Sequence, residues 1–341
     1  MLPDPPCLRR IVAGPWRMGA GLLVLALLLG LAGPAWGQGR TADGAEKSAD
    51  DRRQAPTASD SLAQGTPPRP YRPRRLWWGL GGAAALDAGG MVALHRLWYA
   101  NTARTEWHWY NRAGGRAWYD DWFTYEQQDK LGHVYSSWAL THAAIAYGRW
   151  SGLSRRKAAL LGVGASTIFH AQIEFFDGFS DAYGASRTDL LANATGSALA
   201  GVQHLYPGAT DWFALKYSYR PSPYYDPDRA LGNAIQDYQG ITFWLSLRPE
   251  RMLPRRAGRY WPDGLALSVG HSGTGLGHPI SGVGNTPEHR RQLYVGPDVV
   301  VGELIDLPRS LRVVERVLSF IRLPLPTLQV APNVQWHWVY F

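Results

Sequence analysis

Three helix-length stretches decide the fold: DKLGHVYSSWALTHAAIAYGRW (129–150), KAALLGVGASTIFHAQIEFFDGFSDAYGASR (157–187) and TDLLANATGSALAGVQHLY (188–206). Each consists mostly of apolar and small residues, and each carries acidic, His or Asn residues at intervals of three and four. Such intervals place the polar side chains on one face of a helix. The sequence therefore predicts three helices whose polar faces meet inside a bundle.

The expected polar centre draws on all three stretches. It consists of Asp129, Lys130, His133, Glu174, Asp177, Ser186, Asp189 and Asn193. Because buried charges need partners, one interpretation is a hydrogen-bond and ion-pair network that sets the helix register. Lys130 is a candidate partner for Asp177 or Glu174. Gly196 and Ala200 follow on the face of Asn193 and are expected to allow close packing.

The helix ends are marked by residues that cap helices. Ser154 is a good N-cap for the second helix, and Ser186 or Thr188 can cap the third, which has Asp189 in its first turn. The short connections between the stretches predict that consecutive helices are antiparallel neighbours.

A fourth helix is predicted over residues 76–100, a Gly- and Ala-rich segment with aromatic residues at both ends. Aromatic ends about 20 residues apart are typical of a membrane segment. Asp87 interrupts the segment, so the helix either spans a membrane with Asp87 facing a bundle or is a buried helix outside a membrane. The expected arrangement is a four-helix bundle with a polar centre.

The pattern of apolar residues in the sequence changes after residue 207. Short aromatic or β-branched runs at 217–225, 241–247, 264–271, 292–301 and 327–341 indicate strands, and an apolar helix is expected over 309–321. The last run ends in WHWVYF, which resembles the final strand of outer-membrane barrels. Five strands are too few to close a barrel, so a partial sheet packed on the helices fits better. The predicted class is α+β, with a helical bundle followed by a β-rich aromatic region.

The N-terminal part predicts export. Arg9, Arg10 and Arg17 accompany a Leu-rich run at 19–32, and Ala-Trp-Gly at 35–37 offers a cleavage site. An uncleaved N-terminal anchor is the alternative. The predicted regions are a signal peptide (1–37), a disordered Pro- and Arg-rich linker (38–75), a helical domain (76–206) and a β-rich C-terminal region (207–341).

Composition indicates contact with an anionic or amphipathic surface. The chain of 341 residues has a formal net charge of +8, 16 Trp and 17 Tyr. Trp and Tyr favour places with one apolar and one wet side, and clustered Arg favours anionic surfaces. We expect membrane lipid or a lipopolysaccharide surface as a partner, with an envelope protein as another candidate. No sequence motif for nucleic-acid binding is present, so nucleic acid is not expected. The single cysteine, Cys7, lies in the predicted signal peptide.

Several motifs resemble those of known families. They are D-K-x-x-H at 129–133, E-F-F-D-G-F-S at 174–180 and G-A-S-x-x-D-x-x-x-N-x-x-G at 184–196. Together they resemble the YfiM-like family of predicted periplasmic lipoproteins, a domain of unknown function. Segments 217–224, 237–246 and 323–328 are similar to the long form of that family, although the chain has no lipobox cysteine. A weaker resemblance to VanZ-like membrane proteins implies a four-helix, membrane-associated core.

Two functions of different classes follow. The first is an exported, membrane-associated cell-envelope protein, at the outer membrane rather than the inner membrane, that binds lipid or an envelope partner through aromatic and basic surfaces. The alternative is a metal- or acid/base-dependent hydrolase acting on a lipid or cell-wall precursor. Its catalytic candidates are His133, His170, Glu174 and Asp177, and its candidate metal ligands are His133, His170 and Glu174. A polar cavity that conducts a lipid or ligand is a third interpretation.

No cofactor is expected, and a divalent metal belongs only to the hydrolase alternative. The H-x-x-x-E spacing places His170 and Glu174 on one helix face. It lacks the second His of the zinc motif H-E-x-x-H.

Overall fold

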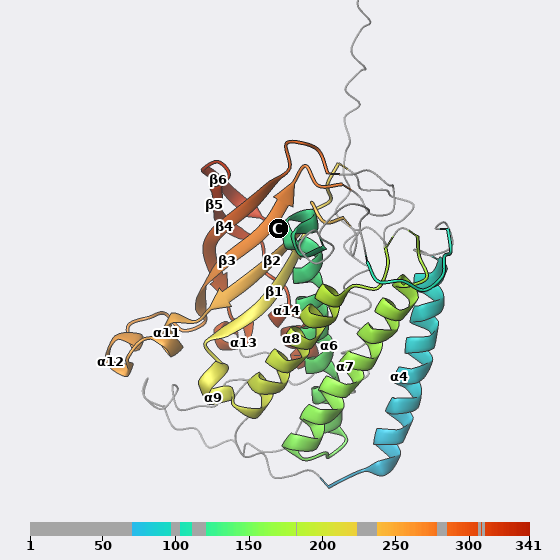
Figure 1. The fold of residues 1–341 in the computed structure, drawn as a ribbon. Coiled ribbons are helices and arrows are strands. Elements are labelled where there is room, and N and C mark those ends of the chain that lie inside the picture. Colours follow the sequence, from blue (N-terminus) through green and yellow to red (C-terminus); the bar gives the residue numbers. More distant parts are fainter. Residues whose placement is uncertain are drawn as a thin grey trace, which may run out of the picture.

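The computed structural model describes residues 70–96, 103–110, 121–181, 183–223, 237–277, 285–305, 308 and 311–341. The predicted signal peptide and most of the predicted linker lie outside these residues. The described chain has α+β architecture, with a group of long helices beside a curved antiparallel sheet (Figure 1).

The three striped stretches form three long helices, as the sequence predicts. They are α6 (Gln128–Trp150), α7 (Arg155–Asp177) and α8 (Arg187–Leu205). The Oγ atom of Ser154 accepts a hydrogen bond from the N–H of Lys157, and Oγ of Ser186 accepts one from the N–H of Asp189. Both serines are therefore N-caps, and each supplies a partner to a helix-end N–H that has none inside the helix.

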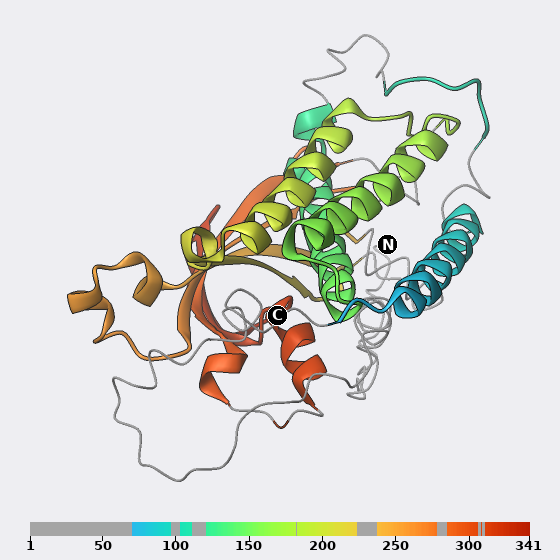
Figure 2. The same cartoon turned by 90° about the horizontal axis from the view of Figure 1, so that it is seen from below.

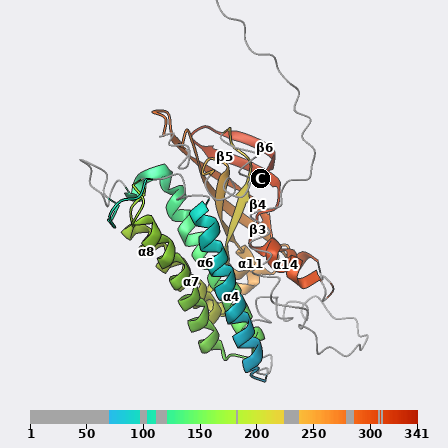
Figure 3. The ribbon, with the colours of Figure 1, turned by 90° about the vertical axis from the view of Figure 1, so that its right-hand side faces the viewer.

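In the part of the chain that the structure describes, only these three helices pack closely against one another. The sequence predicted a four-helix bundle, whereas the structure shows a core of three helices. The fourth helix, α4 (Pro73–Leu94), runs beside α6 and α7 (Figure 3). It is held at a few points: the Tyr147 hydroxyl donates to the carbonyl of Leu76 at 3.1 Å, and the Gln172 amide donates to Asp87 at 3.2 Å. Most of its glycines face open space, which explains the loose attachment.

The C-terminal part forms one six-stranded antiparallel sheet in the order β1-β2-β3-β4-β5-β6. The strands are β1 (Phe213–Tyr219), β2 (Ile241–Leu247), β3 (Leu265–Thr274), β4 (Arg290–Val299), β5 (Leu325–Ala331) and β6 (Gln335–Tyr340). The run predicted over 327–341 is thus two strands. The short helix α9 (Pro207–Thr210) precedes β1, and four short helices lie between later strands: α11 (Pro249–Met252), α12 (Arg255–Gly258), α13 (Val301–Leu304) and α14 (Arg312–Ser319).

The sheet curls so that its two ends approach each other (Figure 2). The Tyr340 hydroxyl of β6 lies 3.0 Å from the Thr242 hydroxyl of β2, and the rings of Trp244, Tyr294 and Tyr340 pack together inside the curve. Arg322 lies in the same space, with its guanidinium 3.9 Å from the centre of the Trp244 ring. The segment carrying Arg322 pairs with the free edge of β1.

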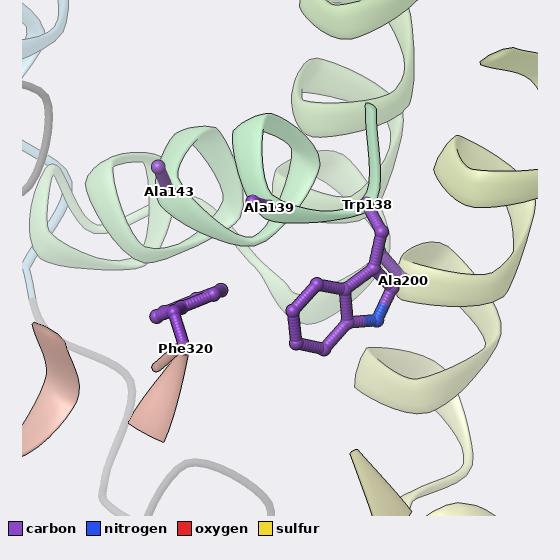
Figure 4. Packing of buried hydrophobic residues seen from close by; sticks show 5 residues of the cluster. All are labelled: Trp138, Ala139, Ala143, Ala200 and Phe320. Carbon is purple, nitrogen blue, oxygen red and sulfur yellow. The ribbon is translucent and has the colours of Figure 1, made fainter. Parts of the chain in front are cut away.

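The helices cover the outer face of β1 and β2. Trp138 and Ala143 of α6, Ala200 of α8 and Phe320 form a hydrophobic cluster at this contact (Figure 4). Beside it, the rings of Tyr135 and Tyr217 stack with centroids 5.7 Å apart. Aromatic packing therefore joins the two parts and places the N-terminal half of α6 against the sheet.

Candidate functional site: a buried charge network between α6, α7 and α8

Lys130 is the centre of a buried ion-pair cluster. Its Nζ lies 2.9 Å from Asp121 Oδ1, 2.9 Å from Asp129 Oδ2 and 2.6 Å from Asp189 Oδ1. The side chain is only 5% exposed. Burial opposes its charge, but the three carboxylates outweigh burial and hold the pKa of Lys130 well above its usual range. The Lys130 ammonium thus supplies the positive charge that this cluster of carboxylates requires.

The partners of Lys130 differ from those that the sequence predicted. Asp177 and Glu174 were expected, whereas the structure shows Asp121, Asp129 and Asp189. A carboxylate oxygen of Glu174 accepts a hydrogen bond from the N–H of Ser186 at 2.9 Å instead. The sequence pattern could not show which carboxylates pair with Lys130, because several acidic residues lie at helical spacing or close to the helices in the sequence.

His133 extends the network by one helical turn. Its Nδ1 lies 3.0 Å from Asn193 Oδ1, and its Nε2 lies 3.7 Å from one oxygen each of Asp129 and Asp189. Burial alone would lower the pKa of His133, but the charges of Asp189, Asp129 and Glu174 raise it to about 9. His133 is therefore an imidazolium at neutral pH and a second cation of the cluster.

The loop before α8 closes the network from one side. The Ser186 hydroxyl donates to Asp121 Oδ2 at 2.7 Å while its oxygen accepts the N–H of Asp189 at 2.9 Å. The Thr188 hydroxyl also donates to Asp121. Asp121 was not among the sequence candidates, since it lies outside the periodic stretches. Ser186 acts both as a helix cap and as a network member.

Tyr238 brings the C-terminal part of the chain into the site. Its hydroxyl donates to Asp129 Oδ1 at 2.7 Å. Burial, followed by the charge of Asp129, raises the pKa of Tyr238 well above its usual value, so the phenol stays protonated as a donor. Sequence reasoning missed Tyr238 because no local pattern links it to a residue 109 positions away.

Two buried polar atoms of the site lack a hydrogen-bond partner among the described residues: Glu174 Oε1 and Asn193 Nδ2. Glu174 is 3% exposed and Asn193 is 4% exposed. Burial and the nearby charge of Asp189 raise the pKa of Glu174 to about 8, so its carboxyl is largely protonated at neutral pH. Unsatisfied buried polar atoms are costly, and they leave the site able to bind one more polar group.

His170 lies in a separate group of hydroxyls between α6, α7 and α8. Its Nε2 is 3.0 Å from Ser136 Oγ, its Nδ1 is 2.8 Å from the carbonyl oxygen of Ser166, and the Ser197 hydroxyl donates to Ser166 Oγ at 2.9 Å. Burial lowers the pKa of His170 to about 4, so the ring is neutral at pH 7. The structure thus places His133 and Glu174 in the charge cluster, whereas His170 lies beside it among serine hydroxyl side chains.

The tightest set of metal-type ligands among the described residues is Asp129, His133 and Asp189, whose ligand atoms lie within 4.8 Å of one another. Both acidic residues of this set already contact Lys130. Asp177 lies at the C-terminal end of α7, where its backbone carbonyl accepts the N–H of Gly184 and its charge acts on Glu174. The arrangement can hold protons and charges in fixed positions, which suits either a register-setting network or acid/base chemistry.

Comparison with known proteins gives one match. Residues 116–204 match the model of a family described as "Predicted periplasmic lipoprotein (DUF2279)". The matched segment contains α6, α7, most of α8 and the residues of the charge network other than Tyr238, so the family similarity covers the helical part of the site and not the sheet. No curated protein and no solved structure showed significant similarity to the chain.

Proposed function

We propose that this chain is an exported, membrane-associated cell-envelope protein, at the outer membrane rather than the inner membrane, that binds lipid through an apolar outer surface. The match to a predicted periplasmic lipoprotein family supports an envelope location. The observation that carries the proposal is the polarity of the sheet: its inner face buries many polar side chains beside an aromatic cluster, whereas its outer face exposes apolar side chains.

The inner face of the sheet is buried and carries many polar side chains beside the cluster of Trp244, Tyr294 and Tyr340. Lys216 and Asp298 form an ion pair at 2.8 Å inside the curve, close to Arg322. Other buried polar residues on this face are Ser218, Thr242, Ser246, Ser268, Ser272, Thr327 and Gln329. A sheet of a water-soluble protein usually shows the opposite pattern, with its apolar side on the core and its polar side in solvent.

The outer face also carries large apolar side chains that remain exposed beside the helices. They are Leu245, Leu267, Val269, Val295, Val330, Trp336 and Trp338. Exposed apolar patches of this kind mark protein or membrane contact sites. Trp at the edge of such a patch suits the border between acyl chains and head groups. Lipid is the occupant that fits a face with alternating apolar residues on several neighbouring strands.

A groove lies beside the charge network, where the helices meet the sheet. It has a volume of about 310 Å³ and lies between α6, α8 and the outer ends of β3 and β4. Its walls include Trp122, Leu131, Val134 and Ala192, and Lys130 and Arg291 lie at its polar parts. An apolar groove of this volume suits an acyl chain. Lys130 is paired with three carboxylates and Arg291 lies 3.3 Å from Glu126, so the groove supports binding of the acyl chain and not of an anionic head group.

Helix α7 adds a second apolar surface. Leu160 is 74% exposed and Ile168 is 65% exposed, and Phe175 and Phe176 are exposed near its C-terminal end. Among the described helices, α7 alone is long and apolar enough to cross a membrane by length and composition. These features support contact of α7 with lipid as well.

Vesicle flotation tests the proposal. The chain purified in detergent is reconstituted with vesicles of phosphatidylethanolamine and phosphatidylglycerol and centrifuged through a density gradient. The wild type should float and remain bound in high salt. A triple variant, Leu267→Ser, Val269→Ser and Trp338→Ser, should lose at least half of the floating fraction because it removes apolar contacts from the outer face.

The matched control is Met252→Ser, Leu253→Ser and Tyr260→Ser, which changes three exposed apolar residues outside the sheet. It should float like the wild type. A wild type that stays at the bottom of the gradient would disprove lipid binding. Equal flotation of the two triple variants would show that the outer sheet face is not the contact.

The hydrolase alternative keeps support from Glu174 Oε1 and Asn193 Nδ2, which have no hydrogen-bond partner in the described part of the chain, and from the close set of Asp129, His133 and Asp189. In its metal-dependent form, a stoichiometric divalent metal should be present and should be lost in His133→Ala. Purified protein free of metal, with no uptake on zinc titration, would argue against that form.

A further inference from the structure

Ser136 and His170 have the geometry of a nucleophile and its general base. Ser136 Oγ on α6 lies 3.0 Å from Nε2 of His170 on α7. Activated serine nucleophiles lie within such a distance of a base, and a third group orients that base. The carbonyl oxygen of Ser166 is this third group, 2.8 Å from His170 Nδ1.

The hydrogen bonds determine which ring nitrogen of His170 carries the proton. A carbonyl oxygen can only accept a hydrogen bond, so Nδ1 of the neutral ring must carry the proton and donate to Ser166. Nε2 then has a free lone pair and can only accept. The Ser136 hydroxyl therefore donates to Nε2, in preference to its longer contact of 3.3 Å with the carbonyl of His133.

Exposure separates Ser136 from its neighbour in the sequence. Ser136 is exposed, whereas Ser137 is fully buried and donates to the carbonyl of His133 at 2.7 Å. His170 is 2% exposed and held between Ser136, Ser166 and the ring of Phe169. The base is thus rigid and shielded, while the hydroxyl that it contacts can be reached from outside.

We propose that Ser136 and His170 form a catalytic dyad for acyl transfer from a carboxylic ester. Ser136 Oγ bonds to the ester carbonyl carbon as its proton passes to His170 Nε2. The bond from that carbon to the alcohol oxygen then breaks, and the departing alcohol takes the proton from Nε2. In the second half, water attacks the acyl-serine and gives a proton to Nε2. The acyl–Oγ bond breaks, and Oγ recovers the proton, which leaves a free acid and the original dyad.

The neighbour of the dyad base favours an ester with an apolar acyl chain. The ring of Phe169 on α7 lies 5.3 Å from the imidazole ring of His170. That the ester is a lipid rests on the proposed lipid-binding function. The dyad itself is independent of it, so a soluble ester and a soluble probe test the chemistry in detergent without any membrane.

Labelling with an alkyl fluorophosphonate, followed by mass spectrometry of the peptide that contains Ser136 and Ser137, tests the dyad. The expected result is one adduct on Ser136 of the folded wild type, and none on the heat-unfolded protein. Ser136→Ala should abolish labelling, and Ser137→Ala should leave it unchanged. His170→Gln should slow labelling at least tenfold, and the same variants should change hydrolysis of p-nitrophenyl butyrate in parallel.

Unchanged labelling in His170→Gln, or equal labelling of folded and unfolded wild type, would overturn the proposal. The comparison of folded with unfolded wild type needs no variant, so it holds even if the His170 substitution weakens the fold. Flotation with no labelling would refute the dyad and keep the lipid-binding function. Labelling without flotation would support the dyad and would show that its ester substrate is not a membrane lipid.

Discussion

Single residues in the charge network owe their state to neighbours from distant parts of the chain. Asp129 is half-buried, with 22% of its side chain exposed, and this burial by itself would raise its pKa, yet Lys130 and His133 hold that pKa well below its usual range. Asp189 behaves oppositely, because burial and the charge of Asp129 raise its pKa. The pKa values of two similar carboxylates in one cluster thus move in opposite directions. Such a difference in pKa separates an acid from a base in many active sites.

His133 should make stability depend on pH. Its pKa is raised from 6.5 to about 9 in the folded state, so the folded protein binds more protons than the unfolded protein between these values. The stabilisation is complete below pH 6.5 and is lost as pH rises through 9. With 19% of the side chain exposed, we expect a loss of about 2–3 kcal/mol in the free energy of unfolding.

Urea unfolding at pH 6.5 and pH 9 measures this loss. The loss of stability in the wild type also contains a contribution from Glu174, whose raised pKa of about 8 acts in the same direction. His133→Gln should therefore show a smaller loss, with only the contribution of Glu174 remaining. His142→Gln is the matched control, because burial lowers the pKa of His142 to about 4 and leaves it neutral throughout this range. An unchanged pH dependence in His133→Gln would contradict the assigned charge.

At the scale of helices, small residues determine how closely α6, α7 and α8 approach. A Cβ atom on Gly196 of α8 would lie 2.1 Å from the carbonyl oxygen of Val134 and 2.2 Å from Oγ of Ser137, both on α6. This contact lies beside the network, between Asn193 and Ser197 on the same helix. The distance between α6 and α8 therefore depends on the absence of a side chain at Gly196. That distance sets the positions of Lys130 and His133 relative to Asp189.

Gly196→Ala should destabilise the protein by about 1–3 kcal/mol because the added methyl group overpacks the helix contact. Thermal unfolding followed by circular dichroism in detergent measures the change. Gly164→Ala on α7 is the control, since its Cβ would meet nothing within 4 Å. That control should be neutral or more stable by about 0.5–1 kcal/mol, because Ala favours the helix over Gly. Similar losses in both variants would mean that close packing at Gly196 is not the cause.

For the whole molecule, Arg322 joins strands across the curve of the sheet. Its guanidinium donates to the Ser268 hydroxyl of β3 at 3.1 Å, to the carbonyl of Pro297 on β4 at 3.2 Å and to the Thr327 hydroxyl of β5 at 2.7 Å. It also lies over the Trp244 ring of β2. Its Nη1 also donates to the carbonyl of Tyr340 on β6 at 3.4 Å. One buried cation thus links five neighbouring strands, β2 to β6, from inside the curve of the sheet.

Arg322→Met should lower the free energy of unfolding by at least about 1.5–3 kcal/mol, the cost of one lost hydrogen bond to a charged group. It should also raise protease sensitivity of the C-terminal strands. Arg156→Met, at an exposed position of α7, is the control and should change stability by less than about 0.5 kcal/mol. Equal stability of the two variants would show that Arg322 does not hold the curled sheet together.

The sequence alone determined the features that depend on local spacing. The intervals of three and four predicted α6, α7 and α8 with their polar faces, and Ser154 and Ser186 marked two helix starts. The strand at Ile241–Leu247 agrees with its predicted bounds. Periodicity and capping work here because they involve residues within a few positions of each other.

Only the tertiary structure decided which groups meet and which face is exposed. Lys130 pairs with Asp189 across 59 positions, and Asp129 binds Tyr238 across 109, while Asp121 joins from outside the three periodic stretches. The curl of the sheet decided that Lys216, Asp298 and Arg322 face inward and that Leu267 and Trp338 face outward. Strand alternation separates two faces but does not say which is buried, because that depends on how distant strands close around one another.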